Sequence, residues 1–448
     1  AAKLDKVKAA WIYVGPINDG GWTQSHDAGR KAVETALGSK VVTTYKENIS
    51  DSGNEAATLI EDLVKDGNNI IFATSFGYGE AMIAAAKKHP DVKFMHATGA
   101  WHNTTPNFAT YYGATEEAKY LAGIAAAHAS KSGTIGFVAP FLIPEVIRHI
   151  NAFALGAQTV NPDIKVKTVE IKSWFDMTKE RQAADSLISQ GADVLANGGD
   201  SPAPGEAAKA KNLPWVGYDS DQSANYPDIW LTAPIYNWGQ YYLAQIQSLL
   251  DGTWKKEDYY GNLKDGFNKL APFGKIVADS TKAEIEAKKA KIIDGTLDAP
   301  ISVKSGGTVW EPKNYGGGSA GPSTLRLGIE RSRNLMTVRL AKDMGMNLVA
   351  EYAERFGIYD HMLPVLAMSL GSGETTVMRM VSGYSIIANG GRQVKPSLID
   401  RIQDRYGKTI YRHDERECEG CSVSAWNDQQ EPDLIDNSDQ ILDPMTAY

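Results

Sequence analysis

The feature that most constrains the fold of this chain is the alternation of short β-type runs with helical stretches over residues 7–295. The runs with strand character lie at residues 8–14, 40–45, 69–73, 93–97, 134–138, 165–170, 194–196, 214–217 and 230–232. Helical stretches lie between them, at residues 52–66, 79–89, 116–130, 145–161, 178–190 and 238–251. Strands separated by single helices form βαβ units and parallel sheets. The sequence therefore predicts an α/β fold.

This series divides into two parts of similar length, roughly residues 1–128 and 131–231, which predicts two doubly wound lobes. In open α/β sheets, ligands bind outside the carboxyl ends of the strands, so the loops after the strands are the candidate site. These loops, at residues 15–22, 74–78, 98–102, 139–144, 172–176, 197–204 and 218–222, are rich in aromatic and acidic residues. Two lobes whose loops face one cleft would close on a ligand by hinge motion.

Composition excludes several classes of protein. The 448 residues carry a formal charge of −8, which argues against a nucleic-acid binder with its usual basic face. No uninterrupted apolar run approaches the ~18 residues that span a bilayer, so direct membrane insertion is not expected. The histidines show no metal-ligand spacing, and neither a metal nor a cofactor is expected.

The Ala-Ala-Lys start, without methionine, favours a removed signal peptide and a periplasmic location.

Several segments of the first 297 residues resemble the basic membrane protein family. The matching segments are residues 11–30 (WIYVGPINDGGWTQSHDAGR), 94–99 (FMHATG), 131–136 (KSGTIG), 174–176 (WFD), 200–203 (DSPA), 217–222 (GYDSDQ) and 251–254 (DGTW). The resemblance implies a type I periplasmic-binding fold, a non-catalytic monomer that passes a purine base or nucleoside to an ABC-transporter permease. It predicts lobe 1 from residues 1–128 and 233–253, and lobe 2 from residues 129–232 and 254–297.

Aromatic residues in the predicted loops are candidates for holding a flat heteroaromatic ligand. Aromatic stacking adds about 0.5–1.5 kcal/mol beyond area burial. Trp22 and Trp174 are predicted to face the two sides of the ring, and Trp238 to lie near the hinge. Further aromatic residues that could wall the pocket are Phe76, Tyr78 and Trp101. The alternative for these three is that they belong to the hydrophobic core.

Acidic residues in the same loops are candidates for hydrogen bonds to the edges of the ligand ring. A carboxylate accepts hydrogen bonds from ring or exocyclic N–H groups, and an unpaired buried edge costs about 1–3 kcal/mol. Asp19, Asp200 and Asp219 are predicted to do this, with Thr23 and Ser201 as smaller hydroxyl partners. The alternative for Asp19 and Asp219 is that they cap the helices that follow them.

One departure from the resemblance bears on the ligand. Nucleoside-binding members of the family place a lysine after the last crossing strand, where it engages ribose. The corresponding stretch here, residues 232–238 (TAPIYNW), has no lysine. This favours a free base, adenine-like, and a nucleoside remains the alternative. An enzyme that acts on purines is disfavoured, because no cluster of aspartates or Ser-His-Asp pairing stands out.

Residues 298–448 resemble an unrelated family, the class A penicillin-binding proteins, in the middle of their transpeptidase domain. The matching segments are residues 310–315 (WEPKNY), 324–326 (TLR), 332–334 (SRN), 371–376 (GSGETT), 388–391 (ANGG) and 443–448 (DPMTAY). The chain is therefore predicted to be a chimera with its seam near residues 294–300. Cys418 and Cys421 are expected to form a local disulfide or to remain thiols, since zinc needs four ligands.

The transpeptidase reaction needs a serine activated by a lysine in a Ser-x-x-Lys pair, a Ser-x-Asn motif and a Lys-Thr-Gly strand. Of these motifs only Ser332-Arg333-Asn334 is present. No Ser-x-x-Lys occurs in the chain, and residues 408–410 read KTI. The resemblance therefore implies an incomplete fragment without transpeptidase activity, and no enzyme activity is predicted for the chain.

Overall fold

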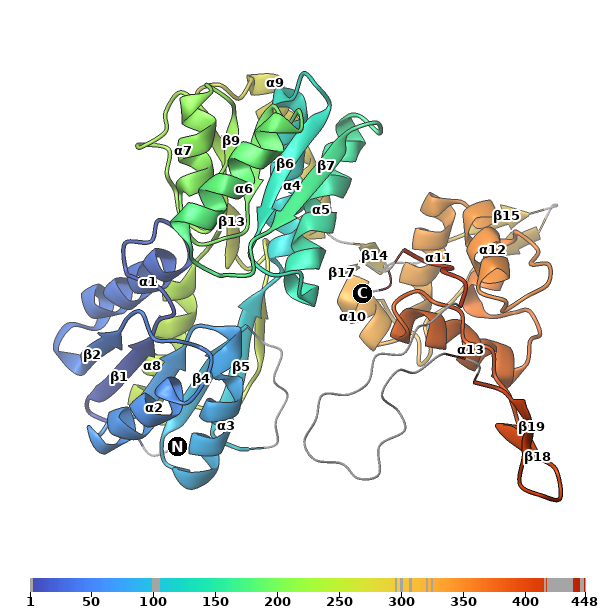
Figure 1. Ribbon diagram of the computed structural model, residues 1–448, viewed down its shortest axis with the longest axis horizontal. Helices are drawn as coiled ribbons and strands as arrows, with labels where there is room; N and C mark the ends of the chain where they lie inside the picture. The colour runs from blue at the N-terminus through green and yellow to red at the C-terminus, as the bar shows by residue number, and fades with distance from the viewer. Residues whose placement is uncertain are drawn as a thin grey trace. The chain divides into compact units, whose positions relative to one another are not determined.

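The computed structural model describes residues 3–98, 105–294, 296–298, 301–305, 308–319, 321–323, 325–414, 416, 438–443 and 447. The chain divides into two compact units, Ala1–Ile293 and Asp294–Tyr448, which we call the N-terminal and C-terminal units. The N-terminal unit contains two parallel sheets flanked by helices, so the predicted α/β fold is confirmed (Figure 1).

The first sheet runs in the order β12-β5-β4-β3-β1-β2, and all its strand pairs are parallel. Its strands are β1 (Val7–Ile12), β2 (Val41–Lys46), β3 (Ile70–Ala73), β4 (Lys93–Ala97), β5 (Phe108–Gly113) and β12 (Tyr259–Gly261). The helices against it are α1 (Trp22–Leu37), α2 (Glu55–Lys65), α3 (Gly79–Lys88) and α8 (Trp238–Asp251). Because side chains alternate along each strand, Trp11 faces α8 and Ile12 faces α2 and α3.

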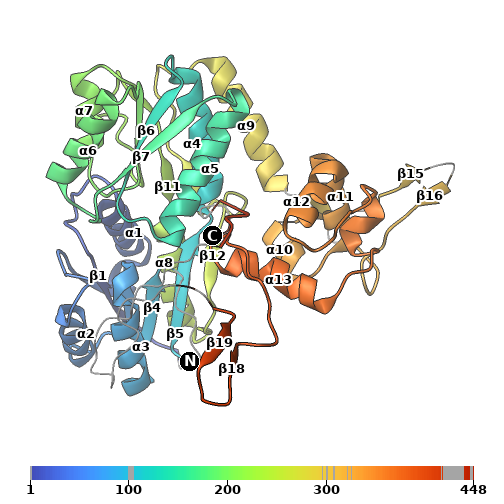
Figure 2. The same ribbon diagram turned by 45° about the vertical axis from the view of Figure 1, so that its right-hand side comes forward.

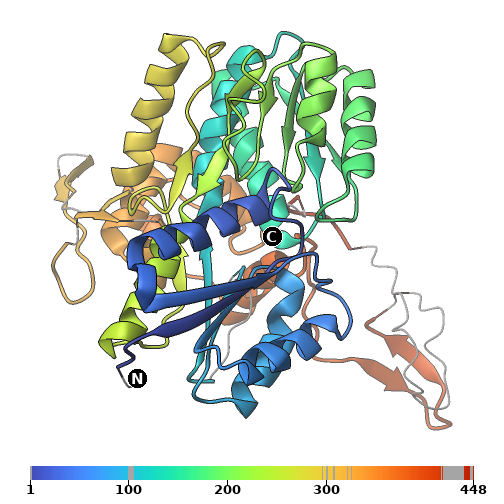
Figure 3. The same ribbon diagram turned by 90° about the vertical axis from the view of Figure 1, so that its left-hand side faces the viewer.

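The second sheet runs in the order β10-β9-β8-β6-β7 and is also parallel. Its strands are β6 (Thr134–Ala139), β7 (Lys165–Glu170), β8 (Val194–Asn197), β9 (Trp215–Val216) and β10 (Trp230–Thr232). The helices of this lobe are α4 (Thr115–Ala129), α5 (Pro144–Val160), α6 (Met177–Ser189), α7 (Ala203–Ala210) and α9 (Asp279–Asp294). Figure 3 shows the two lobes, each a sheet with its helices, from the side.

The chain passes between the lobes at three places, each next to the two-stranded sheet of β11 (Pro234–Tyr236) and β13 (Asn268–Leu270) or to β12 (Figure 2). The crossings lie between β5 and α4, between β10 and β11, and between β12 and β13. Residues 259–261, which the sequence placed in lobe 2, pair with β5 as the edge strand of the first sheet. Residues 115–128, which the sequence placed in lobe 1, form most of α4, and α4 packs against α5 and the strands β8, β9 and β10 of lobe 2. The other lobe boundaries stay a prediction.

The C-terminal unit has helices and only two-stranded sheets among its described residues. Its helices are α10 (Leu325–Glu330), α11 (Asn334–Met344), α12 (Met346–Arg355), η3 (Leu366–Leu370) and α13 (Val377–Ala388). Its strands are β14 (Thr296–Asp298), β15 (Val303–Ser305), β16 (Thr308–Trp310), β17 (Gly321–Ser323), β18 (Arg401–Gln403) and β19 (Thr409–Arg412). Its buried clusters are small, and large apolar side chains such as Val377 and Leu398 are exposed by 81% and 94%.

Candidate functional site

A pocket lies where strand order reverses in each sheet of the N-terminal unit. In the first sheet the reversal falls between β1 and β3, and in the second between β6 and β8. At such switch points the loops leave the sheet in opposite directions and open a crevice at the carboxyl ends of the strands. The residues that line the pocket are Val14, Trp22, Ser75, Phe76, Thr98, Glu145, Trp174, Asp200 and Tyr218. The volume free of protein atoms in the pocket, including its opening to solvent, is about 300 Å³.

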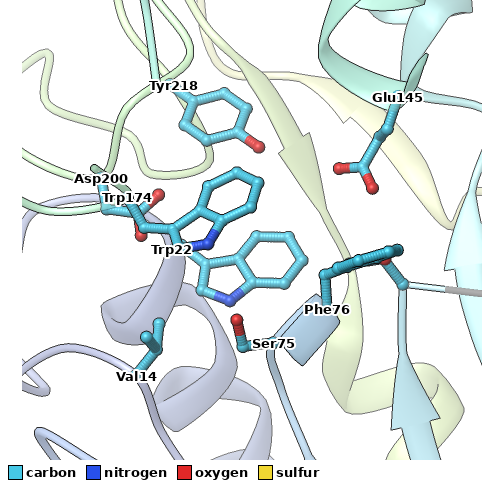
Figure 4. A pocket seen from close by; sticks show the side chains of 9 residues that line it. Val14, Trp22, Ser75, Phe76, Glu145, Trp174, Asp200 and Tyr218 are labelled. Carbon is cyan, nitrogen blue, oxygen red and sulfur yellow. The ribbon is translucent and has the colours of Figure 1, made fainter. Parts of the chain in front are cut away.

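Aromatic rings form much of the pocket wall. Figure 4 shows the indoles of Trp22 and Trp174 turned into it, together with the Phe76 ring. Trp22 is fixed in place, because its Nε1 donates to the Thr74 carbonyl at 2.7 Å and its ring contacts Trp238 edge-on with centroids 5.3 Å apart. Trp174 rests edge-on against Phe141 at 4.9 Å. Rings held in this way offer a flat ligand a surface already arranged for stacking.

Two carboxyl groups face the same pocket. Asp200 is buried, and burial raises its pKa well above the ordinary value, with Asp19 and Asp219 as the next contributors. Glu145, at the start of α5, accepts a hydrogen bond from the Tyr112 hydroxyl at 2.6 Å, and burial raises its pKa as well. Figure 4 shows Asp200 and Glu145 on opposite sides of the indole rings. The arrangement suits a flat ligand that carries polar groups on two opposite edges.

The other predicted carboxylates are buried next to the pocket. Asp19 accepts from the backbone N–H groups of Gly21, Thr23 and Gln24 at 2.9, 2.8 and 3.0 Å, so it caps the start of α1. Burial raises its pKa to about 6. Asp219 has φ of 58°, and neither of its carboxylate oxygens has a hydrogen-bond partner among the described residues. Its pKa is raised by burial, although the charge of Lys119 opposes this.

Lys119 is a buried cation that sequence reasoning missed. It lies in α4, donates to the Asn197 carbonyl at 3.2 Å, and its ammonium lies 4.3 Å from the centre of the Tyr218 ring. Burial lowers the pKa of Lys119 to about 7, while the charge of Asp219 acts in the opposite direction. The sequence shows Lys119 as a single lysine among alanines and other apolar residues of α4, and this pattern could have indicated a buried cation. The side chain does not line the pocket.

The remaining predicted residues are turned to other partners or lie outside the described residues. The Tyr78 hydroxyl donates to the Ile49 carbonyl at 2.7 Å, and its ring packs against α2 and α3. Trp238 stacks on His26 at 4.0 Å, behind Trp22. The hydroxyl oxygens of Thr23 and Ser201 accept from backbone N–H groups at 3.2 and 3.3 Å. Trp101 is outside the described residues.

Five lining residues were not among the sequence candidates: Val14, Ser75, Thr98, Glu145 and Tyr218. Ser75, Thr98 and Tyr218 fall in loops that the strand pattern had marked, so a signal existed. Glu145 gave no signal in the sequence. Acidic residues are common in the first turn of a helix, where they interact favourably with the helix dipole. Among the described residues, no group of three or more His, Cys, Asp or Glu side chains could hold a metal ion.

Two α/β lobes joined by three crossings, with a pocket between them at both switch points, form the fold of the periplasmic-binding-protein class. A solute-binding protein of an ABC transporter from Conexibacter woesei has this fold, with a TM-score of 0.55 at 21% identity over 66% of this chain and 98% of that one. Residues 6–302 match the family model of PnrA-like substrate-binding proteins of ABC transporters, and the chain belongs to this family.

Two relatives match this part of the chain over most of their own length. A purine-binding protein of Brucella abortus is 41% identical over 309 residues, which cover 68% of this chain and 87% of that protein. A putative glucose-binding protein of an ABC transporter from Haloferax volcanii is 36% identical, over 66% of this chain and 74% of that protein. Substrate-binding proteins of this family bind small ligands and work with a permease outside the cytoplasm. No helix among the described residues is long and apolar enough to cross a bilayer.

The remainder of the chain matches a second family. Residues 287–440 match the family model of the penicillin-binding protein transpeptidase domain. Penicillin-binding protein 1A of Rickettsia bellii is 49% identical over 129 residues, which cover 28% of this chain and 16% of that protein. The chain therefore joins a substrate-binding domain to a small part of the length of a penicillin-binding protein.

Proposed function

We propose that the N-terminal unit binds a purine nucleobase, adenine-like, between its lobes and delivers it to an ABC-transporter permease in the periplasm, acting as a monomer. The observation that carries this proposal is the composition of the pocket wall. The indole rings of Trp22 and Trp174 stand between the carboxyl groups of Asp200 and Glu145, and the Phe76 ring lines the same pocket. A purine base matches this wall, since its faces stack and its edges carry N–H groups.

Lack of hydrogen-bond partners at the buried acids supports a ligand with several donors. Among the described residues, no hydrogen bond reaches the carboxylates of Asp200 or Asp219. Buried polar atoms are nearly always satisfied in native structures, so the carboxyl of Asp200, which lines the pocket, is placed to accept from groups that the ligand supplies. The amino and ring N–H groups of adenine are donors of this kind.

A nucleoside is the alternative ligand. Residues 232–238 carry no lysine that could engage ribose, and Lys119, which donates to the Asn197 carbonyl, does not line the pocket. Both features favour the free base. A hexose, suggested by the name of the H. volcanii relative, would bring a hydroxyl on nearly every carbon into a pocket with several purely aromatic or aliphatic walls.

Calorimetric titration with adenine, hypoxanthine, adenosine and glucose tests the proposal. We expect adenine to bind with micromolar or tighter affinity and adenosine at least tenfold more weakly. Glucose should give no heat of binding. Tight binding of glucose with none of any purine would overturn the proposal, and preferred binding of adenosine would replace the base with the nucleoside.

The C-terminal unit gives a second candidate function, transpeptidation, which we propose is absent. Ser332 lies two residues before the start of α11 with φ of 49°, and the chain has no Ser-x-x-Lys that would supply an activated nucleophile. A serine without an adjacent base is a weak nucleophile. The proposal for the whole chain is therefore a binding protein without catalytic function.

A further inference from the structure

Glu145 occupies a position between the lobes that gives its two carboxyl oxygens different environments. It begins α5 in lobe 2, while its partner Tyr112 lies in β5 of lobe 1. Tyr112 donates to Oε1 at 2.6 Å, and no hydrogen bond to Oε2 is found among the described residues, although the nearby Thr98 hydroxyl also acts to lower the pKa of Glu145. The side chain is partly accessible and lines the pocket. One oxygen is thus fixed by the protein and the other remains for a ligand.

A second tyrosine fixes the direction of this hydrogen bond. The Tyr236 hydroxyl donates to the Tyr112 oxygen at 2.9 Å, so Tyr112 acts as acceptor toward Tyr236 and gives its own proton to Glu145. Chains of hydroxyl groups ordered in this way reinforce one another in a buried site. While the lobes are closed, Glu145 therefore has to present an acceptor to Tyr112.

The opposite end of the pocket is closed by Asp200, beyond the two indole rings (Figure 4). A flat ring between these groups meets a carboxyl at each end. In a purine base, donors occur on the six-membered ring and its substituents, and again at the N9–H of the five-membered ring. In a nucleoside, N9 bears the sugar and has no hydrogen to donate.

We propose that Glu145 is the specificity-determining residue that selects free bases against N9-substituted purines, by accepting the N9–H with the oxygen that Tyr112 does not hold. This inference rests on the proposed function and names the residue and the ring atom behind it. Loss of the N9 donor leaves a buried acceptor unpaired, which is the strongest means of rejecting a near-isosteric ligand.

Substitution Glu145→Gln inverts the polarity of the group that faces the ligand. The amide oxygen stays with Tyr112, whose proton has no other acceptor in this hydrogen-bond chain, and the amide NH₂ then points into the pocket as a donor. Glu206→Gln is the matched control. Glu206 accepts from the Tyr226 hydroxyl at 2.6 Å in the same lobe and does not line the pocket.

Affinities of adenine and 9-methyladenine for the full chain provide the test. 9-Methyladenine lacks the donor but is far smaller than a nucleoside, so steric exclusion of ribose does not enter the comparison. We expect the wild type to prefer adenine by about tenfold or more. In Glu145→Gln this ratio should fall below about threefold, and Glu206→Gln should keep the wild-type ratio.

A wild-type protein that binds both ligands equally would overturn the inference, whether or not the variants fold. The same holds if Glu145→Gln retains the preference for adenine. If no purine binds the wild type at all, the proposed function itself fails, and this result is distinct from loss of selectivity among purines that do bind.

Discussion

The Ser220 hydroxyl donates to the Gly21 carbonyl at 2.9 Å and so joins a loop of lobe 2 to the loop that precedes α1 in lobe 1. Gln222 makes a parallel contact, from its Nε2 to the Gly20 carbonyl at 3.0 Å. A Cβ atom on Gly21 would lie 2.7 Å from the Asp200 carbonyl oxygen. The lobes therefore touch at a place where only a residue without a side chain fits, which is the geometry of a closed conformation.

Gly21→Ala should prevent this closure. In this conformation the added methyl group meets the backbone of Asp200, and we expect separation of the lobes to relieve that contact. We expect the ligand to bind at least tenfold more weakly, with most of the change in the dissociation rate. Small-angle scattering with saturating adenine should show a larger radius of gyration than for the wild type. The exposed Ser132→Ala is the control, and a variant that closes normally would contradict the prediction.

Trp174→Ala should weaken adenine binding by more than tenfold, or about 1.4 kcal/mol. The substitution removes one aromatic wall of the pocket and its stacking contribution. Trp174→Phe keeps a flat ring and should lose much less. Titration calorimetry of both variants measures the difference. Equal affinity of the alanine variant and the wild type would remove Trp174 from the binding surface.

Stability in the absence of ligand should depend on pH through the buried acids. Burial raises the pKa of Asp200, and that of Asp19 and Glu180 to about 6 and 7. When the pKa of a carboxyl is higher in the folded than in the unfolded state, that carboxyl lowers the stability of the folded protein at any pH above its pKa in the unfolded state. Through Asp200, the free energy of unfolding of the wild type therefore falls as the pH rises above about 4, the pKa of the carboxyl in the unfolded chain.

The difference in Tm between Asp200→Asn and the wild type isolates this effect, because the buried histidines contribute equally to both proteins. We expect the variant to gain stability relative to the wild type as the pH rises above about 4. Thermal unfolding followed by circular dichroism at intervals of pH measures it. A difference that stays constant or shrinks with rising pH would show that Asp200 is not destabilised by its surroundings.

Fluorescent penicillin should not label the protein. Acylation needs a serine next to its activating lysine, and the chain lacks this pair. A complete penicillin-binding protein run on the same gel is the positive control. A labelled band that disappears in Ser332→Ala would show that this serine is activated by a group that the sequence does not reveal.

The sequence by itself determined the repeating βαβ pattern and the strand-end loops, because local hydrophobic periodicity and short connections fix both. It identified Trp22, Phe76, Trp174 and Asp200, which do line the pocket. It did not identify β5 or β12. Tyr259 pairs with Tyr111 across a large separation along the chain, and a strand as short as β12 has no periodicity of its own.

Only the tertiary structure decided which acidic residues face the pocket. Asp19 and Glu145 both lie at the start of a helix, yet Asp19 turns its carboxylate to the backbone of α1, while Glu145 is held toward the pocket by Tyr112. Asp19 precedes α1 and Glu145 lies in the first turn of α5, and an acidic residue is common at either kind of position. The difference arises because the partner of Glu145 belongs to the other lobe, and such a contact exists only once the two lobes have come together.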